Sequence, residues 1–270
     1  MNHQTLELRD GHALAWREAG QGAPLVLVHG WSMSSAVFIE ALAALSADYR
    51  VLAPDLRGHG YSSPGEPYHL EALSEDLLFW LDALGVVNAH FLGWSLGGQV
   101  CMQIASDAPQ RIKKLALVCS TPRFCNGDGW EGGLSPTQVR AMERNLKRNF
   151  LGTMGEFFFS MFAGEEHPPE RYRQILKDSV RSVPQITPEV SVGGLMTLRD
   201  SDLRDVAEKL SCPTLVHYGA LDLITPRAAG DWLADAIPGA EQVCEGSCGH
   251  APFFSCPEKT FSVWREYFSR

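Results

Sequence analysis

The chain has 270 residues, of which 45% are hydrophobic, so it can bury one sizeable core. Its formal net charge of -9 excludes a general nucleic-acid binder, because the phosphate backbone would repel it. No apolar run approaches the roughly 18 residues of a membrane span, and residues 1–11 lack the apolar region of a signal peptide. The seven cysteines form no CxxC pair, which favours reduced thiols in a cytoplasmic protein.

The first part of the chain alternates apolar runs with helical patterns. Two short alternating runs flank Asp10-Gly11 and predict a hairpin. The continuous apolar run that follows is typical of a strand buried on both faces. Strands that alternate with helices indicate a parallel sheet covered on both sides. The predicted strands are 24–30, 49–56, 89–94 and 113–120, and the predicted helices are 36–45, 70–84 and 96–106.

The pattern changes after Ser120. Residues 121–200 show helical periodicity, many aromatic residues and no convincing strand, and the alternation returns over 201–270. We therefore expect one α/β domain, formed by 1–120 and 201–270, with a helical insertion at 121–200. Glycines near the ends of this insertion are candidate hinges: Gly127, Gly129, Gly132, Gly133 and the pair Gly193-Gly194.

The segment FLGWSLGGQV contains G-x-S-x-G, from Gly93 to Gly97, between a predicted strand and a predicted helix. In that context the pattern forms a sharp turn that exposes the serine hydroxyl. The glycines let the strand and the helix approach each other, and the helix N-terminus favours developing negative charge. We therefore predict that Ser95 is a nucleophile; the alternative is a purely structural turn.

A nucleophilic serine needs a base, and the base needs an acid that orients it. In this layout the acid and then the histidine follow the serine along the chain. Asp222 ends the predicted strand 213–222, and His250 follows the strand predicted at 240–245. Because the carboxyl ends of parallel strands meet at one edge of a sheet, we expect Ser95, Asp222 and His250 to lie together. The alternatives are a helix cap for Asp222 and a loop histidine for His250.

An acyl-transfer site also needs hydrogen-bond donors for the oxyanion. The backbone N–H of Leu96 is one candidate, and the N–H of Trp31, after the first buried strand, is the other. The ring of Trp31 forms a wall of an acyl pocket or packs in the core. We expect His29 and His59 to shape their loops rather than to transfer protons. The sequence contains no P-loop, dinucleotide fingerprint or metal-ligand spacing, so we expect no metal and no cofactor.

Taken together, the segments HGW, DLRGHGYS, GWSLGG, GALD and GHAPF resemble the α/β-hydrolase family and span nearly the whole chain outside the insertion. The resemblance implies an α/β-hydrolase fold, with a mostly parallel sheet flanked by helices and a helical lid insertion. It assigns the catalytic triad to Ser95, Asp222 and His250. A serine in the turn, rather than an aspartate, tells against the epoxide hydrolase and haloalkane dehalogenase branches.

A closer resemblance is to the pimeloyl-acyl-carrier-protein methyl ester esterases of biotin synthesis, carried by FLGWSLGGQV, PRF, GGLMTLRDSDLR and GHAPFFSCP. It implies a serine carboxylesterase that removes the methyl ester from a pimeloyl chain bound to acyl carrier protein. It further implies that Trp31 and Leu96 are oxyanion residues that contact the substrate. The acyl-contacting stretch of the lid would be Phe157, Phe158, Phe159, Ser160 and Met161.

The insertion also carries basic residues that an acidic carrier protein could meet. A local positive surface on an acidic protein steers an acidic partner, whereas the alternative is a solvated helix face diluted by nearby glutamates. The basic residues on one helix face are Arg140, Arg144, Lys147 and Arg148, and a second basic group is Arg171, Arg173, Lys177 and Arg181.

The run 150–162 is rich in phenylalanine. It either packs the insertion onto the sheet domain or also lines an acyl channel, and both roles could hold.

Other functions are open to the same residues. A general short-chain carboxylesterase or a C–C bond hydrolase would use this fold and triad on small substrates. A ligand receptor would keep the fold and signal through its lid with very slow turnover. We expect a cytoplasmic monomer that binds neither nucleic acid nor a membrane.

Overall fold

The computed structural model describes residues 3–166, 169–180 and 182–270. Eight strands form one sheet in the order β1-β2-β4-β3-β5-β6-β7-β8. The first two strands pair antiparallel, β2 is antiparallel to β4, and all the remaining pairs are parallel. The strands are β1 (Gln4–Glu7), β2 (Ala13–Ala19), β3 (Ala23–Val28), β4 (Tyr49–Pro54), β5 (Ala89–Trp94), β6 (Ile112–Val118), β7 (Thr214–Gly219) and β8 (Glu241–Glu245).

The sheet confirms the strands that the apolar runs predict, but β3, β4 and β6 each end two residues earlier than predicted and β7 ends three residues earlier. β7 stops at Gly219, so Asp222 lies in the turn after the strand rather than at its end. The reason is a close approach: a Cβ on Gly219 would lie 2.1 Å from the carbonyl oxygen of Gly249. The chain therefore leaves the ladder where the loop of His250 crosses it.

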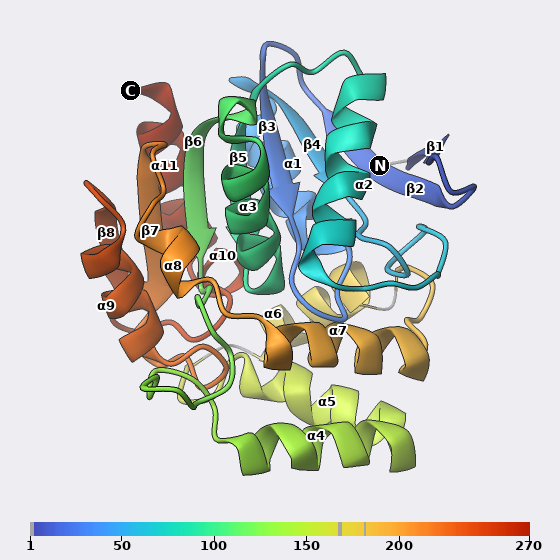
Figure 1. Cartoon of the computed structure of the whole chain (residues 1–270), viewed down its shortest axis with the longest axis vertical. Coiled ribbons are helices and arrows are strands. Elements are labelled where there is room, and N and C mark those ends of the chain that lie inside the picture. Colours follow the sequence, from blue (N-terminus) through green and yellow to red (C-terminus); the bar gives the residue numbers. More distant parts are fainter. Residues whose placement is uncertain (1–2, 167–168, 181) are drawn as a thin grey trace.

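Helices cover both faces of the sheet (Figure 1). α2 and α3 pack against each other on one face, and α1 and α11 pack against each other on the opposite face. No helix in the described part of the chain is long and apolar enough to cross a membrane. The helices of the sheet domain are η1 (Ser35–Phe38), α1 (Ile39–Leu45), α2 (Leu70–Ala83), α3 (Leu96–Asp107), η2 (Pro109–Arg111), α8 (Arg204–Ala207), α9 (Arg227–Ala236), α10 (Pro252–Ser255) and α11 (Pro257–Ser269).

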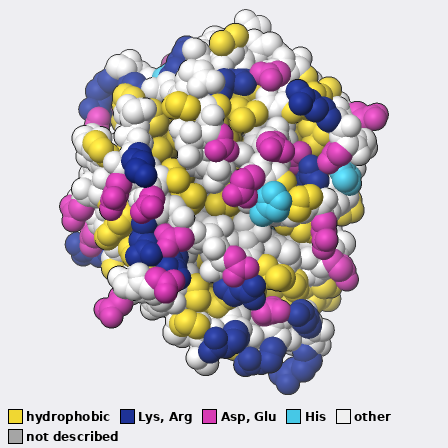
Figure 2. Space-filling model, viewed as in Figure 1, with side chains coloured by type: hydrophobic (Ala, Val, Ile, Leu, Met, Phe, Trp, Pro, Cys, Tyr) yellow, Lys and Arg dark blue, Asp and Glu magenta, His cyan; other side chains and the backbone are white. Residues whose placement is uncertain are grey.

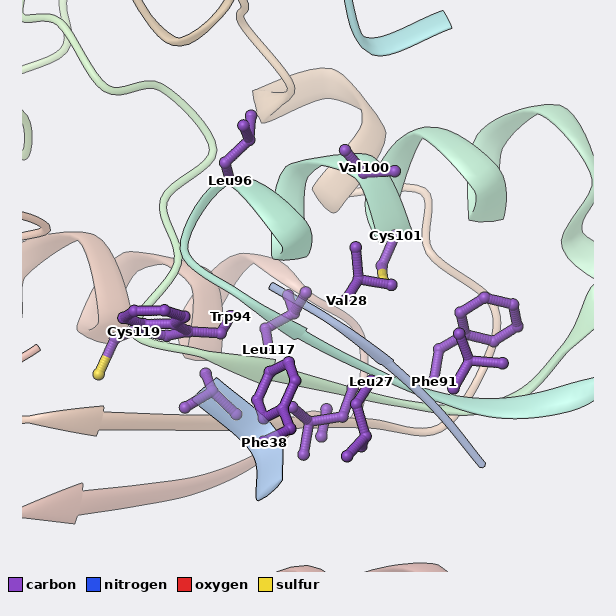
Figure 3. Packing of buried hydrophobic residues seen from close by; sticks show 14 of the residues in the cluster. Leu27, Val28, Phe38, Phe91, Trp94, Leu96, Val100, Cys101, Leu117 and Cys119 are labelled. Carbon is purple, nitrogen blue, oxygen red and sulfur yellow. The ribbon is translucent and has the colours of Figure 1, made fainter. Parts of the chain in front are cut away.

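The core lies between the central strands and these helices. Leu27 and Val28 of β3 and Phe91 of β5 have no exposed surface, and Figure 3 shows them packed among Phe38 and Val100 from the flanking helices. Burial of each such side chain contributes roughly 1.5–3 kcal/mol to stability. The core therefore holds the strands whose carboxyl ends carry the predicted site.

Between β6 and α8 the described chain forms four α-helices and a short π-helix, which lie beyond the carboxyl ends of the strands in Figure 1. The basic pattern predicted for 140–148 does form a helix, with Val139 and Leu146 buried. The elements of the insertion are α4 (Pro136–Arg148), α5 (Phe150–Ser160), α6 (Pro169–Ile175), the π-helix η3 (Leu176–Val180) and α7 (Pro188–Asp200).

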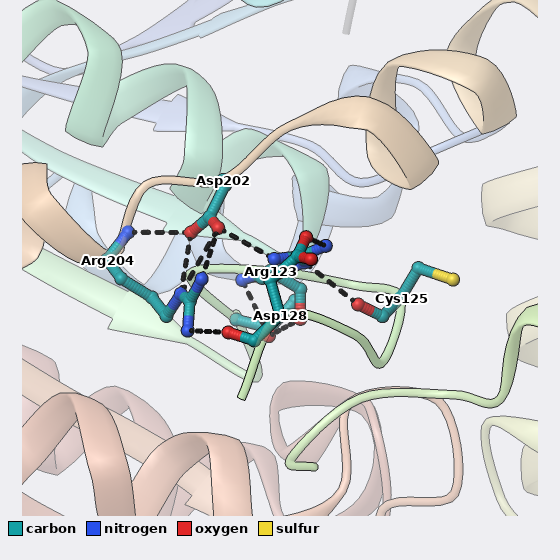
Figure 4. A network of polar contacts seen from close by, with 6 residues as sticks. Arg123, Cys125, Asp128, Asp202 and Arg204 are labelled. Atoms are coloured by element: carbon teal, nitrogen blue, oxygen red, sulfur yellow. Dashed lines mark hydrogen bonds and ion pairs between the residues drawn. The ribbon is translucent and has the colours of Figure 1, made fainter. Parts of the chain in front are cut away.

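The two chain segments that join the insertion to the sheet domain are held together (Figure 4). Arg123 donates to Asp202 at 2.9 Å and pairs with Asp128 at 2.7 Å. Arg204 also pairs with Asp202, at 2.7 Å. The backbone N–H of Leu203 donates to the carbonyl of Pro122 at 2.8 Å. This ion-pair network fixes where the insertion leaves and rejoins the sheet domain.

The expectation that Gly193-Gly194 is a hinge is wrong. Both glycines lie inside α7. A Cβ on Gly193 would lie 2.5 Å from the ring of Tyr68, and one on Gly194 would lie 2.8 Å from the ring of Trp31. Their small size lets α7 pack tightly against the sheet domain, which is the physical reason for glycine at these positions.

Candidate active site

Ser95 sits in a strained turn between β5 and α3. Its backbone has φ 56° and ψ -120°, a conformation that residues with a side chain rarely adopt. The surrounding glycines make that turn possible. A Cβ on Gly93 would lie 2.4 Å from the carbonyl oxygen of Gly97, and one on Gly97 would lie 2.1 Å from that of Val28. The sequence therefore needs glycine there because strand, turn and helix touch backbone to backbone.

The backbone of the turn is tied down, whereas its hydroxyl is not. Ser95 N–H donates to Val118 at 2.9 Å, and the Ser120 hydroxyl donates to the Ser95 carbonyl at 2.9 Å. Within the described part of the chain, Ser95 Oγ has no hydrogen-bond partner, and the side chain is buried. The backbone of Ser95 is thus fixed, while its Oγ makes no structural hydrogen bond within the described residues.

Asp222 and His250 lie in direct contact. His250 Nδ1 is 2.8 Å from Asp222 Oδ2, and both side chains are buried. Asp222 Oδ1 accepts the backbone N–H groups of Ile224 and Thr225 at 2.8 and 2.9 Å. Asp222 therefore does both things that the sequence allowed: it caps the turn and orients the histidine. With Asp222 holding Nδ1–H, Nε2 of His250 is left as the basic nitrogen.

Thr225 and Cys119, which lie next to this pair, were not predicted as site residues from the sequence. The Thr225 hydroxyl is 2.7 Å from Asp222 Oδ2, 3.3 Å from His250 Nδ1 and 3.0 Å from the carbonyl of Cys119. Thr225 follows Asp222 by three positions, a spacing that favours a side chain in a turn but carries no motif. Its hydroxyl is a second donor to Asp222 Oδ2, beside His250 Nδ1–H.

Cys119 offers the one group of potential metal donors among the described residues. Its sulfur, Asp222 and His250 place one ligand atom each within 4.8 Å of one another. Burial, followed by the charge of Asp222, raises the pKa of the Cys119 thiol well above its ordinary value.

The loop of His250 is fixed from two sides. Trp94, the residue before Ser95, donates its ring N–H to the His250 carbonyl at 2.7 Å. The His250 N–H donates to the carbonyl of Met161 in the insertion at 2.9 Å. The Trp94 and His250 rings lie 5.5 Å apart. The histidine is therefore positioned by the sheet domain and by the insertion together.

Leu96 directly follows Ser95, and Trp31 lies in the loop after β3, which approaches the turn: a Cβ on Gly30 would lie 3.1 Å from Ser95 Cβ. Both side chains are buried, and no acceptor within the described residues receives either backbone N–H. The Trp31 ring donates to the Ser191 carbonyl of α7 at 2.8 Å and packs edge-on against Phe157 at 4.7 Å. The ring thus joins the sheet domain to the insertion, while both amide groups stay available as donors.

His29 and His59 hold the loop that presents Trp31. His29 Nε2 accepts from the Leu56 N–H at 3.0 Å, and His59 Nε2 accepts from the Ser32 N–H at 3.2 Å. Burial lowers the pKa of His29 to about 4. Burial, and then the neighbouring His29, lowers the pKa of His59 to about 3. Both rings are neutral at pH 7 and act as structural acceptors.

The predicted acyl-contacting stretch is divided by its helix. Phe157 packs on Trp31, Phe158 lines a cavity, and Phe159 is 67% exposed. The Ser160 hydroxyl donates to the Phe157 carbonyl at 2.7 Å, and Met161 is buried beneath the His250 loop. Since consecutive residues of a helix point in different directions, five neighbours cannot all face one ligand.

A cavity of about 380 Å³ lies between the insertion and the loop after Trp31. Its walls are mostly apolar, and the loop supplies Ser32, Met33 and Ser34. Ser95, Asp222 and His250 do not line it. Its apolar lining includes Met154, Phe158, Tyr172, Leu176 and Val180.

The basic residues of α4 are all exposed and form a cluster at the lower end of the molecule in Figure 2. Lys147 pairs with Glu143 at 2.7 Å. Arg140, Arg144 and Arg148 have no carboxylate partner in the described ranges. In the second basic group, Arg171 forms a two-pronged bond with Glu40 of α1, at 2.6 and 2.9 Å, and Arg181 lies outside the described residues.

Comparison with known proteins supports the α/β-hydrolase fold that the sheet order indicates. A family model described as the alpha/beta hydrolase fold matches residues 23–257. A pimeloyl-[acyl-carrier protein] methyl ester esterase from Nitrosomonas europaea is 36% identical over 245 residues, covering 91% of this chain and 95% of the relative. A hydrolase from Pseudomonas aeruginosa has a TM-score of 0.85 at 31% identity, covering 100% and 99% of the two chains. An esterase from Exiguobacterium antarcticum has a TM-score of 0.92 at 24% identity over 98% and 99%, which shows a common fold.

These similarities cover the sheet domain and the insertion alike. The matched range contains Ser95, Asp222 and His250, in the chain order expected for this architecture. The sheet order, with β1 and β2 at one edge and parallel strands beyond, confirms the predicted fold class. The chain belongs to the α/β-hydrolase fold family, together with these esterase and hydrolase relatives.

Proposed function

We propose that this protein is a serine carboxylesterase that hydrolyses the methyl ester of pimeloyl-acyl-carrier protein, releasing methanol and the free carboxylate in biotin biosynthesis. The support for the substrate is the 36% identity, along 91% of this chain, to a relative that bears this name. The support for the chemistry is the pairing of buried Asp222 with His250 at 2.8 Å, together with the bond from Trp94 to the His250 carbonyl just before the strained turn at Ser95. Seven unpaired cysteines support action in the cytoplasm, where thiols stay reduced.

In the proposed mechanism His250 Nε2 takes the proton of Ser95 as Oγ attacks the ester carbonyl. Asp222 holds Nδ1–H, so the ring keeps the required tautomer and its positive charge is stabilised. His250 then passes the proton to the leaving methoxide, and methanol departs. Water, activated by the same histidine, hydrolyses the acyl-enzyme and regenerates Ser95.

The oxyanion is assigned to the backbone N–H groups of Trp31 and Leu96. Neither group has an acceptor among the described residues, so each can donate to a developing negative charge. Leu96 begins α3, whose N-terminus adds a favourable partial positive charge. His29 and His59 contribute by holding the loop that contains Trp31 in a single conformation.

We assign carrier docking to the exposed basic face of α4. Arg140, Arg144 and Arg148 form no ion pair with a carboxylate of the described chain. The chain as a whole has a net charge of -9, so this face is a local exception and would orient an acidic partner. The apolar cavity of about 380 Å³ next to the Trp31 loop is the proposed space for the apolar part of the substrate.

The test is turnover with defined substrates. Purified protein is given pimeloyl-acyl-carrier protein methyl ester, simple p-nitrophenyl esters and a dienoic diketone of the kind that C–C hydrolases cleave. We expect multiple turnovers and methanol release, with the highest kcat/KM on the carrier-bound ester. A preference for the diketone or for short esters would overturn the substrate assignment, and a single slow turnover would favour a receptor.

A cellular version of this test uses rescue. The gene is expressed in a biotin-requiring strain that lacks its own esterase, with the Ser95→Ala variant as control. We expect growth without biotin for the wild type alone. Growth with Ser95→Ala would contradict the nucleophile assignment.

A further inference from the structure

Two cysteines lie in contact beside the loop of His250. Cys248 is in the loop after β8, and Cys256 immediately precedes α11. Their sulfur atoms are 2.8 Å apart, and both thiols are free. This distance is shorter than an ordinary contact between sulfur atoms, so a disulfide of about 2.05 Å requires a displacement of only about 0.7 Å. None of the other five cysteines, all of them described, lies in such a pair.

The surroundings of Cys256 favour the reactive thiolate. The hydrogen bond from Cys248 lowers the pKa of the Cys256 thiol, and so do the Thr260 hydroxyl at 3.8 Å and the ammonium group of Lys259. Burial and the carboxylate of Glu245 act in the opposite direction. Cys256 also occupies the N-cap position of α11, a helix of 13 residues, although its side chain makes no capping hydrogen bond there.

The two thiols differ in the way that a redox pair requires. Cys256 is partly exposed, so a small oxidant in solvent can reach it. Cys248 is 1% exposed, and the hydrogen bond to Cys256, followed by burial, raises its pKa. Cys256 therefore reacts first, and Cys248 is already in position to react with the oxidised sulfur.

We propose that Cys248 and Cys256 are a reversible redox-modification site, which peroxides oxidise to a disulfide, and that this disulfide lowers turnover by displacing His250. Hydrogen peroxide transfers one oxygen to the Cys256 thiolate, giving a sulfenic acid, and its other oxygen leaves as hydroxide and takes up a solvent proton. Cys248 then attacks the sulfenic sulfur, the S–S bond forms, and water leaves with the Cys248 proton. Two electrons pass from the thiols to the peroxide, and a dithiol reductant returns them.

The link to catalysis is the position of Cys248. The ring that the disulfide would close runs from Cys248 to Cys256 and contains His250. The Cys248 carbonyl accepts the Leu221 N–H at 2.9 Å, next to Asp222. A displacement of Cys248 is therefore passed to both partners of the His250–Asp222 contact. Misplacement by about 1 Å can cost about 100-fold in rate, so we expect a fall in kcat of about threefold or more.

The experiment treats the reduced full-length protein with hydrogen peroxide and maps its peptides without reduction. We expect one linkage, between Cys248 and Cys256, together with the lower kcat on a small soluble ester, and recovery of both after dithiothreitol. The linkage does not depend on the proposed esterase function, whereas the change in kcat rests on it. Failure of the esterase proposal would thus leave the peptide map readable.

Three variants sharpen the result. Cys256→Ser, checked by thermal unfolding, should form no linkage and keep its kcat in peroxide. Cys248→Ser should accumulate a sulfenic acid on Cys256 that dimedone traps. Cys244→Ser, which removes an exposed cysteine without a thiol partner, should respond as the wild type does. Absence of the linkage, an unchanged kcat in the linked form, or equal inactivation of Cys256→Ser would each overturn the proposal.

Discussion

The loops at the carboxyl edge of the sheet and the helical insertion above them differ in how their polar groups are held. At the edge, Asp222 accepts hydrogen bonds on both carboxylate oxygens, and His29 and His59 are buried and neutral. In the insertion, Arg140 and Arg144 are exposed and have no carboxylate partner in the described chain. A substitution at the edge would break buried hydrogen bonds and lower stability, whereas a substitution of an exposed arginine in the insertion would cost little stability.

The difference suggests a division of labour. A site that must stabilise charge in its transition state needs preorganised groups, which the edge supplies. Partner choice needs complementary charge and shape, which an insertion of amphipathic helices supplies. The two regions meet where the Met161 carbonyl accepts the His250 N–H and where Trp31 reaches α7, so they are not independent. Four predictions test this division.

The largest effect is expected from the edge, at the proposed nucleophile. Ser95→Ala should lower kcat by roughly 10⁴–10⁶-fold on every ester, because the other site residues cannot replace the covalent step. The measurement is steady-state kinetics on carrier-bound and small esters. Ser106→Ala, an exposed serine later in α3, is the matched control and should be unchanged. If the Ser95→Ala variant were as active as the wild type, Ser95 would not be the nucleophile.

The next effect concerns the partner of His250. Asp222→Asn should lower kcat by about 10⁴-fold, because the amide oxygen stays with the N–H groups of Ile224 and Thr225. The amide NH2 then faces His250 Nδ1 as a donor, which favours the wrong tautomer of the ring. Kinetics at pH 7 measures this loss, and circular dichroism checks the fold. Asp235→Asn, in an exposed part of α9, should have no effect. A loss below tenfold for Asp222→Asn would show that the 2.8 Å contact to His250 is not used.

A third prediction concerns stability and pH at the same edge. The pKa of His29 is lowered to about 4 and that of His59 to about 3, whereas both are near 6.5 in the unfolded chain. The unfolded state therefore binds more protons below about pH 6.5. The contribution of these two histidines to the free energy of unfolding should be constant above that pH and fall by a few kcal/mol as the pH drops to about 4.

Urea unfolding at pH 7 and pH 5 measures this fall in stability. His59→Gln keeps an acceptor but cannot be protonated in this range, so its stability should depend less on pH. An equal fall in the variant and in the wild type would place the effect in other groups.

The smallest effect is expected from the insertion, and it should depend on the substrate. Arg140→Ala with Arg144→Ala should lower kcat/KM on the carrier-bound ester by about tenfold, mainly at low salt, and leave a small soluble ester unchanged. Lys113→Ala with Lys209→Ala, exposed lysines of the sheet domain, removes the same charge elsewhere. Equal losses on both substrates, or equal losses in the control pair, would contradict docking on α4.

The regular elements were predictable because their patterns depend on nearby residues. The alternation of apolar runs and helical segments predicted the strands and helices of the sheet domain, and G-x-S-x-G predicted the turn at Ser95. The prediction that failed interpreted two glycines from their sequence position alone. Gly193 and Gly194 suggested a hinge, but they lie inside α7, where Tyr68 and Trp31 from distant segments leave no room for a Cβ. A sequence cannot show which surface will press against a glycine.

The roles of individual side chains were harder to predict than their segments. Thr225 carried no motif, yet its hydroxyl lies between Asp222, His250 and Cys119. Phe157, Phe158 and Phe159 looked alike in sequence, but one packs on Trp31, one lines the cavity and one is largely exposed. The helix rotation and the neighbouring segments decide among such equivalent residues.

By itself the amino-acid order determined the α/β architecture, the strained turn and which histidine and carboxylate face the same sheet edge, because hydrophobic periodicity and strand direction fix these features. Only the tertiary structure decided that Asp222 and His250 touch, that the insertion supports the histidine loop, and that Cys248 and Cys256 meet. The physical reason is that such contacts join residues from separate elements, and their distances depend on how whole helices and strands pack.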